Sequence, residues 1–173
     1  DSFMIAHFKN IADVGIYNTA YSVFQSALVL PAFIMNSYYP LMLKSFGQIK
    51  YVGLGLVSLA FVGTLTIFIF APPIINLLTG GGFVGSTESL KILSLGFPAY
   101  FLSALFMWIL ISKGKYKLML FVYTSGLFFN LILNFIYIPK YSFLAASWIT
   151  VISEYFILAL QFMVLWLGQK KLK

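Results

Sequence analysis

Asparagine, threonine and glutamate residues interrupt two strongly apolar stretches near the end of the chain. Asn130 and Asn134 are one helical turn apart, as are Thr150 and Glu154, so each pair points to one side of its helix. Amide, hydroxyl and carboxylate oxygens are hard donors, which suit Na⁺, or H⁺ at the carboxylate, better than a transition metal. Interhelical hydrogen bonds around a neutral Glu154 would also account for these residues. The pattern therefore leaves two interpretations, a cation site and a polar helix–helix contact.

The two pairs belong to helices that a short turn must join. The segment PKYS (139–142) separates an apolar run over 118–138 from another over 143–167, and so short a connection makes the two helices antiparallel neighbours. Glu154 lies about eleven residues into its helix, which places it roughly 16 Å deep at about 1.5 Å per residue. That depth is near the middle of a bilayer, where an unpaired carboxylate costs at least about 2.5–3.5 kcal/mol. We therefore expect Glu154 to be protonated, paired, or in contact with water or an ion.

The composition of the whole chain predicts an all-α integral membrane protein. Of 173 residues, 61% are hydrophobic and 9% are charged, whereas soluble domains average roughly 45–50% and about 25%. Residues 1–8 resemble the end of a further helix, so we expect the chain to be a piece of a longer protein. A membrane-spanning helix needs about 20 mostly apolar residues, and five runs meet that length: 14–43, 51–71, 90–112, 118–138 and 143–167.

The eleven basic residues, all of them lysines, predict an orientation. Eight lie in alternate gaps and in the tail over 168–173, on one side of the predicted helices, and the other side holds only Lys9, Lys91 and Lys140. Cytoplasmic loops of membrane proteins carry the excess of lysine, so we expect a cytoplasmic C-terminus with a basic tail in the cell membrane. Because the lysines follow the gaps, the net charge of +7 does not indicate nucleic acid as a partner.

The first apolar run carries a polar face. Asn18, Ser22, Gln25 and Asn36 recur at helical spacing, with Pro31 among them. Small and polar residues of this kind form helix–helix seams in membranes. They also line water-filled cavities beside a proline kink. The residues alone do not decide between these two interpretations.

Residue types that support enzymatic chemistry are scarce. The chain has no cysteine and one histidine, and no Ser–His–acid or paired-carboxylate arrangement is present. We therefore expect no enzyme and no cofactor beyond Na⁺ or H⁺ as a coupling ion.

Five segments, in their order and spacing, give the chain a family resemblance: VGIYNTAYSVFQ (14–25), YYPLMLK (38–44), GGFVGSTESLKIL (81–93), SKGKYK (112–117) and NFIYIPKYSFLAASWITVISE (134–154). The chain resembles the C-terminal half of a lipid-linked oligosaccharide flippase of the multidrug/oligosaccharidyl-lipid/polysaccharide exporter superfamily. The resemblance implies helices eight to twelve of a twelve-helix transporter, with residues 1–8 ending helix seven. It also implies that the face formed by Asn18, Ser22, Gln25 and Asn36 lines the central cavity of the transporter.

The function implied by the resemblance is transport without covalent chemistry. Such a flippase moves undecaprenyl-pyrophosphate-linked oligosaccharide across the cytoplasmic membrane by alternating access, for surface polysaccharides such as lipopolysaccharide or exopolysaccharide. Its partners would be the lipid bilayer, the lipid-linked oligosaccharide and an N-terminal lobe of the same protein. A multidrug/cation antiporter of the same superfamily remains an alternative, and so does a membrane-embedded enzyme or subunit of polysaccharide assembly.

Sister flippases for the peptidoglycan lipid precursor suggest the members of a sodium site. The matching positions are Asp1, Asn130, Asn134, the Ala146 carbonyl and Thr150. Those relatives have aspartate where this chain has Asn134, which removes a negative charge and should weaken Na⁺ binding. Glu154, one turn beyond Thr150, would compensate for that charge or take up a proton instead. A second difference is that relatives commonly have glycine in place of Ser142 and Ala145.

Overall fold

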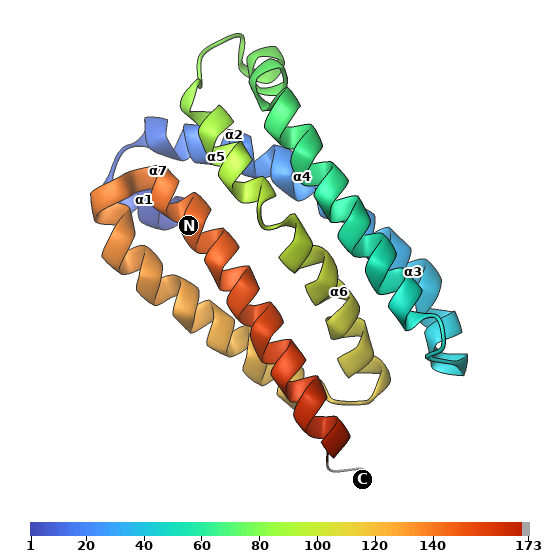
Figure 1. Cartoon of the computed structure of the whole chain (residues 1–173). Helices are drawn as coiled ribbons and strands as arrows, with labels where there is room; N and C mark the ends of the chain where they lie inside the picture. Colours follow the sequence, from blue (N-terminus) through green and yellow to red (C-terminus); the bar gives the residue numbers. More distant parts are fainter. Residues whose placement is uncertain (171–173) are drawn as a thin grey trace.

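The computed structural model describes residues 1–170, which form helices and short turns with no strand among them. This confirms the predicted all-α class. The predicted basic tail over 168–173 lies outside the described residues, except for the backbone of residues 168–170 at the end of the last helix. In chain order (Figure 1), the helices are α1 (Ser2–Phe8), α2 (Ile11–Ala27), α3 (Val29–Lys44), α4 (Ile49–Thr79), α5 (Gly85–Ser94), α6 (Phe97–Ser112) and α7 (Tyr116–Lys170).

The helix predicted over 14–43 is divided into α2 and α3, which meet at Leu28. There the Leu28 N–H donates to the Gln25 carbonyl at 3.1 Å, an i→i+3 bond that tightens the last turn of α2. Pro31 explains the position of the break, because it has no N–H to donate to the Ala27 carbonyl and its ring crowds that carbonyl. The proline therefore interrupts the helix one turn before its own place in the sequence.

The predicted apolar runs leave a gap between helices over 72–89. In the structure this gap is shorter, because α4 extends to Thr79 and α5 begins at Gly85. α4 continues through Pro72 and Pro73 until Gly80 ends it with φ +59°. This left-handed conformation is readily adopted by glycine and is common just past a helix end. The turn between α4 and α5 is therefore built on glycine and not on the two prolines.

The helix predicted over 90–112 is also divided. α5 and α6 meet at Leu95 and Gly96 and are bent by 43° relative to each other. The Thr64 hydroxyl of α4 donates to the Ser94 carbonyl at 2.8 Å, next to this bend. The side chain thus satisfies a carbonyl that loses its place in a continuous helix.

α7 reverses direction at Ser142, where φ is 52° and ψ is −136°. The reversal separates a first arm (116–141) from a second arm (143–170), and the two arms run side by side (Figure 1). Phe129 and Phe156 stack across them with ring centroids 4.4 Å apart. The predicted antiparallel pairing is therefore present, although one residue makes the turn in place of the four-residue loop over 139–142.

Aromatic side chains fill the contact between α2 and α6. The Phe24 ring stacks on Phe97 at 5.1 Å and meets the edge of Tyr100 at 5.4 Å. Phe24 and Phe97 are almost completely buried. These ring contacts join the end of α2 to the start of α6, and the face of α2 that carries Asn18, Ser22 and Gln25 is exposed.

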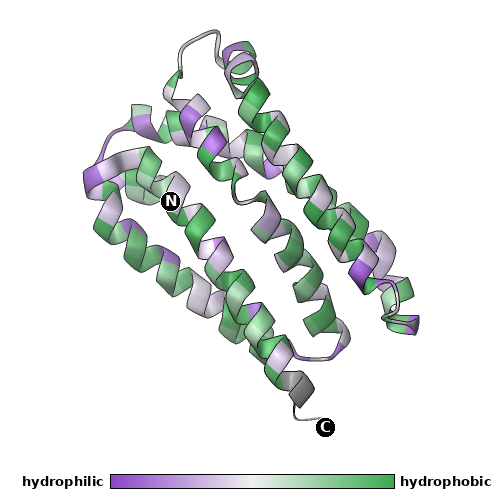
Figure 2. Ribbon diagram, viewed as in Figure 1, coloured by the Kyte–Doolittle hydropathy of each residue, from purple (hydrophilic) through white to green (hydrophobic). Residues whose placement is uncertain are grey.

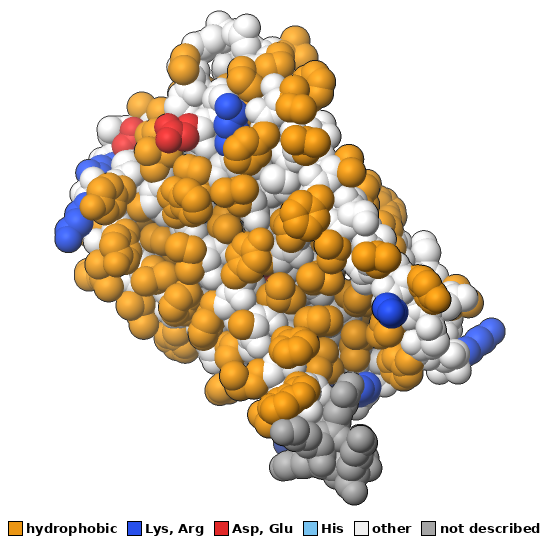
Figure 3. Space-filling model, in the orientation of Figure 1, with side chains coloured by type: hydrophobic (Ala, Val, Ile, Leu, Met, Phe, Trp, Pro, Cys, Tyr) orange, Lys and Arg blue, Asp and Glu red, His pale blue; other side chains and the backbone are white. Residues whose placement is uncertain are grey.

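The outer surface is strongly apolar over the middle of the bundle (Figures 2 and 3). By length and composition, three helices of the described chain could cross a membrane, or four if the bent pair α5–α6 counts as one span. Exposed large apolar side chains would be costly in water and are ordinary in lipid. The fold is therefore that of a helical bundle compatible with a membrane protein.

Charged residues collect at the two ends of the bundle (Figure 3). The α3–α4 turn, the α6–α7 turn and the end of α7 lie at one end (Figure 1). The α1–α2 turn, the α4–α5 turn and the α7 reversal lie at the other end, where the acidic side chains also appear. Successive gaps between the predicted helices therefore lie at alternate ends of the bundle, as expected from the sequence.

Candidate functional site

A cluster of polar side chains gathers around the carboxylate of Asp1. Asp1 Oδ2 accepts hydrogen bonds from the Tyr17 hydroxyl at 2.8 Å and from the Thr150 hydroxyl at 2.9 Å. Asp1 Oδ1 accepts from Asn134 Nδ2 at 2.6 Å, and the same Nδ2 donates to Asn130 Oδ1 at 2.8 Å. We call Asp1, Tyr17, Asn130, Asn134 and Thr150 the Asp1 cluster. Four of its five members are predicted site residues.

Three segments far apart in sequence supply the cluster. Asp1 precedes α1, Tyr17 lies on α2, and the remaining members come from the two arms of α7. Asn130 and Asn134 point the same way because they are one turn apart on the first arm. The reversal at Ser142 then brings Thr150 of the second arm opposite them. The site therefore depends on the α7 hairpin and on the docking of α1 against it.

Oxygen acceptors outnumber donor hydrogens in the cluster. The single Thr150 hydroxyl hydrogen has two acceptors within reach, Asp1 Oδ2 and the Ala146 carbonyl at 2.8 Å. Asn134 is fully buried and its Oδ1 has no hydrogen-bond partner. A buried acceptor without a donor is unfavourable by about 1–3 kcal/mol. A bound cation, or rotation of the Asn134 amide toward one, would remove that deficit.

The donor chemistry fits a monovalent cation better than a transition metal. One carboxylate and several neutral oxygens are available, and no group of three or more His, Cys, Asp or Glu residues suited to a metal occurs among the described residues. Hard oxygen donors of this kind suit alkali and alkaline-earth cations. With one formal negative charge, the cluster would be neutralised by one monovalent ion.

Glu154 lies outside the hydrogen-bonded Asp1 cluster. Its side chain is buried and borders two cavities, of about 340 and 280 Å³. Asp1, Asn130 and Thr150 line the smaller cavity together with Glu154. The structure therefore places the predicted acid beside the cluster without making it a member.

The predicted polar face of α2 and α3 is exposed along its whole length. Asn18, Ser22, Gln25 and Asn36 are all exposed, whereas Tyr17 of the adjacent face is buried. The Asn18 amide oxygen accepts from the Ser2 hydroxyl at 2.6 Å, and the Ser22 hydroxyl donates to the Asn18 carbonyl within α2. No helix of the described chain buries these four side chains, so the structure shows no seam at this face within the described residues.

Two contributors to the site were missed from the sequence. Tyr17 was hidden among the aromatic residues of an apolar run, and its hydroxyl gives no periodic signal. Ser153, which accepts from Asn130 Nδ2 at 3.2 Å, carried a usable signal. It lies three residues after Thr150, so both face the first arm.

Comparisons of the chain with family models, with curated proteins and with solved structures give no match. Assignment of function therefore depends on the residues and geometry described above.

Proposed function

We propose that the chain is the C-terminal lobe of a cation-coupled transporter that flips undecaprenyl-pyrophosphate-linked oligosaccharide across the cytoplasmic membrane. The Asp1 cluster, with its surplus of oxygen acceptors and the partnerless Asn134 Oδ1, carries the cation-coupled part of the proposal. The family resemblance of the five sequence segments supports the substrate. The exposed polar face of α2 and α3 would line the path of the hydrophilic headgroup.

The proposed topology has five spans. α2 with α3, α4, and the bent pair α5–α6 would each cross once, and the two arms of α7 would cross separately. Each arm exceeds the about 20 residues that a span requires. The lysine-rich end of the bundle would face the cytoplasm, following the excess of lysine in cytoplasmic loops.

The proposed mechanism is a cation-dependent shift between inward-open and outward-open states. A cation held by Asp1, Asn134 and Thr150 would tie α1 to both arms of α7. A ligand shifts such an equilibrium only through different affinities for the two states. A complete shift from 1:99 to 99:1 requires the cation to bind one state about 5.5 kcal/mol more tightly than the other, and a smaller difference in affinity shifts the populations only in part.

The test uses proteoliposomes that contain a fluorescent undecaprenyl-pyrophosphate oligosaccharide in one leaflet. We expect a Na⁺ gradient to accelerate its movement to the other leaflet, and Asp1→Asn to abolish that acceleration. Glu88→Gln is the matched control, because it neutralises an exposed acid at the start of α5, outside the cluster. Flipping that is indifferent to cation gradients, or equally affected by both substitutions, contradicts the proposal.

One observation favours a multidrug/cation antiporter as the second candidate. The 340 Å³ cavity is lined by Glu154 and by the aromatic side chains of Tyr100, Trp108 and Tyr123, with no lysine among the lining residues. Acidic and aromatic walls bind organic cations through charge and cation–π attraction. Export of a cationic dye, without any flipping of the lipid-linked sugar, would favour the antiporter.

A further inference from the structure

Glu154 forms part of a wall shared by two cavities. It lies one turn beyond Thr150 on the second arm of α7, and its side chain is 7% exposed. The cavity of about 340 Å³ and the cavity of about 280 Å³ both include Glu154, Tyr100 and Tyr123 in their linings. The three side chains therefore stand between the two spaces.

The two cavities differ in what lies at their far ends. The larger one extends to Asn36 and Ala32 of α3, which are exposed. The smaller one extends to Asp1, Asn130 and Thr150 of the Asp1 cluster. A path from the open polar face to the Asp1 cluster therefore passes the Glu154 side chain.

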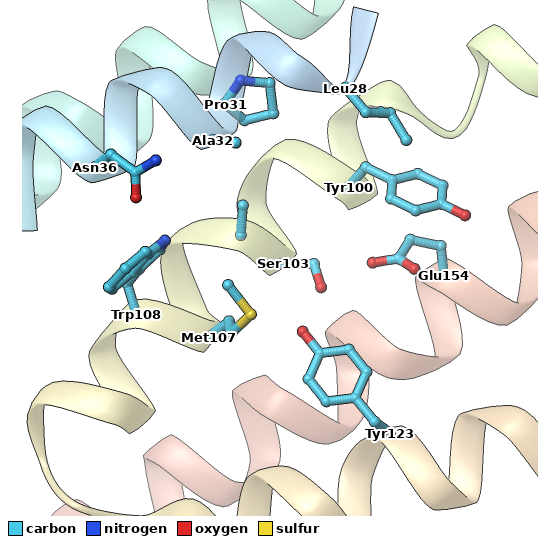
Figure 4. Close-up of a pocket in the computed structure, with 11 residues that line it drawn as sticks. Leu28, Pro31, Ala32, Asn36, Tyr100, Ser103, Met107, Trp108, Tyr123 and Glu154 are labelled. Atoms are coloured by element: carbon cyan, nitrogen blue, oxygen red, sulfur yellow. The ribbon is translucent and has the colours of Figure 1, made fainter. Parts of the chain in front are cut away.

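The cavities beside Glu154 are lined by hydroxyl groups and by no lysine or histidine side chain. Tyr21, Tyr100 and Tyr123 border the smaller cavity with Glu154, and Figure 4 shows the Ser103 hydroxyl directed into the space near Glu154 and Tyr123. In the described part of the chain, no lysine or histidine forms an ion pair with this carboxylate. A buried acid without a basic partner concentrates cations in a water-filled space beside it.

From this geometry we infer that Glu154 controls access to the cation site: its carboxylate passes a monovalent cation from the larger cavity to the Asp1 cluster. The inference rests on the proposed cation site. Glu154 acts on the rate at which the cation reaches the cluster, whereas Asp1 holds the bound ion. Tyr21, Tyr100, Tyr123 and Asp1 are the titratable groups that share the cavities with Glu154.

The test compares the rate and the equilibrium of Na⁺ binding in the full-length protein. Stopped-flow tryptophan fluorescence gives the rate, with Trp108 in the wall of the larger cavity as the reporter. Na⁺-dependent thermal stabilisation gives the equilibrium midpoint. We expect Glu154→Gln to slow Na⁺ association about tenfold or more, the scale of electrostatic focusing in charged clefts. The midpoint of stabilisation should move less than about threefold, because the ligands of the ion remain in place.

A second variant tests the route without touching Glu154. Asn36→Lys places a positive charge at the exposed rim of the larger cavity and should also slow Na⁺ association. Asn76→Lys is the control, because Asn76 is exposed and lines a different cavity beside the α4–α5 turn. Glu154→Asp, which keeps the carboxylate, should restore most of the lost rate.

Each outcome decides the inference. Unchanged association rates in both Glu154→Gln and Asn36→Lys overturn it. Complete loss of Na⁺ stabilisation in Glu154→Gln also overturns it, because Glu154 would then be a ligand of the bound ion. If the parent protein shows no Na⁺ effect at all, the proposed cation site is refuted, and the inference with it. A slower rate with a retained midpoint is the expected result.

Discussion

Asn134→Asp provides the sharpest test of the Asp1 cluster. The substitution replaces Nδ2, which donates to Asp1 Oδ1 at 2.6 Å and to Asn130 Oδ1 at 2.8 Å, by a carboxylate oxygen. Both attractive contacts become contacts between acceptors. Without a cation the variant must therefore be less stable than the parent, or must take up a proton between the two carboxylates.

The expected magnitude follows from the two lost hydrogen bonds. A hydrogen bond to a charged group contributes about 1.5–3 kcal/mol and a neutral one about 0.5–1.5 kcal/mol. We expect the free energy of unfolding of Asn134→Asp to fall by roughly 2–4 kcal/mol in choline chloride. Na⁺ should restore it, because two carboxylates and the neutral oxygens then surround one cation. At about 100 times the dissociation constant, binding stabilises the folded state by about 2.7 kcal/mol.

The assay is unfolding in detergent micelles during titration of NaCl against choline chloride at constant ionic strength. Asn36→Asp is the matched control, because it makes the same chemical change on an exposed residue outside the cluster. Only Asn134→Asp should combine lower stability in choline with a larger Na⁺ response than the parent. If Na⁺ stabilises both variants equally, the reasoning about the cluster is refuted.

Two further substitutions test the α7 hairpin. Gly126→Ala would place a Cβ 2.5 Å from Ile157 Cγ1, so we expect a loss of about 1–3 kcal/mol in the free energy of unfolding. In an Ile157→Ala background the same glycine substitution should cost nothing, because the clashing side-chain atoms are absent. Gly55→Ala, with nothing within 4 Å of the added Cβ, should be neutral or stabilising. Equal stability of Gly126→Ala and Gly55→Ala would contradict the close contact. Ser142 has φ 52° and its hydroxyl donates to Asp13, so in an Asp13→Ala background we expect Ser142→Gly to raise the unfolding midpoint by relieving about 1–3 kcal/mol of strain. The same midpoint for Ser142→Ala and Ser142→Gly would show that no strain is present.

The all-α class and the α7 hairpin could be predicted from the sequence because their causes are local. Apolar length and composition predict helices, and PKYS (139–142) marks the reversal in sequence. The breaks at Leu28 and at the α5–α6 bend could not be located as well. Their positions depend on which carbonyl loses its partner and on which side chain replaces it, as Thr64 does at Ser94.

The composition of the site was predictable only in part. The spacing of Asn130 with Asn134 and of Thr150 with Glu154 places each pair on one helix face. Periodicity cannot show how far two residues on one face lie from a third element. Thr150 contacts Asp1, whereas Glu154, one turn further, borders the two cavities that α6 and α7 line together with α3 or α2. That difference depends on where α1 begins against α7, which no local pattern encodes.

The exposed polar face of α2 and α3 and the position of Glu154 support the same conclusion. The Gln25 amide would have no hydrogen-bonding partner if lipid covered it. In the described chain no helix covers it, so within a membrane water or another polypeptide must do so. The larger cavity meets this face at Asn36 and reaches Glu154 at its inner end. The exposed polar face and a buried acid thus border one cavity, and the Asp1 cluster borders the next, which is the arrangement that the proposed ion access requires.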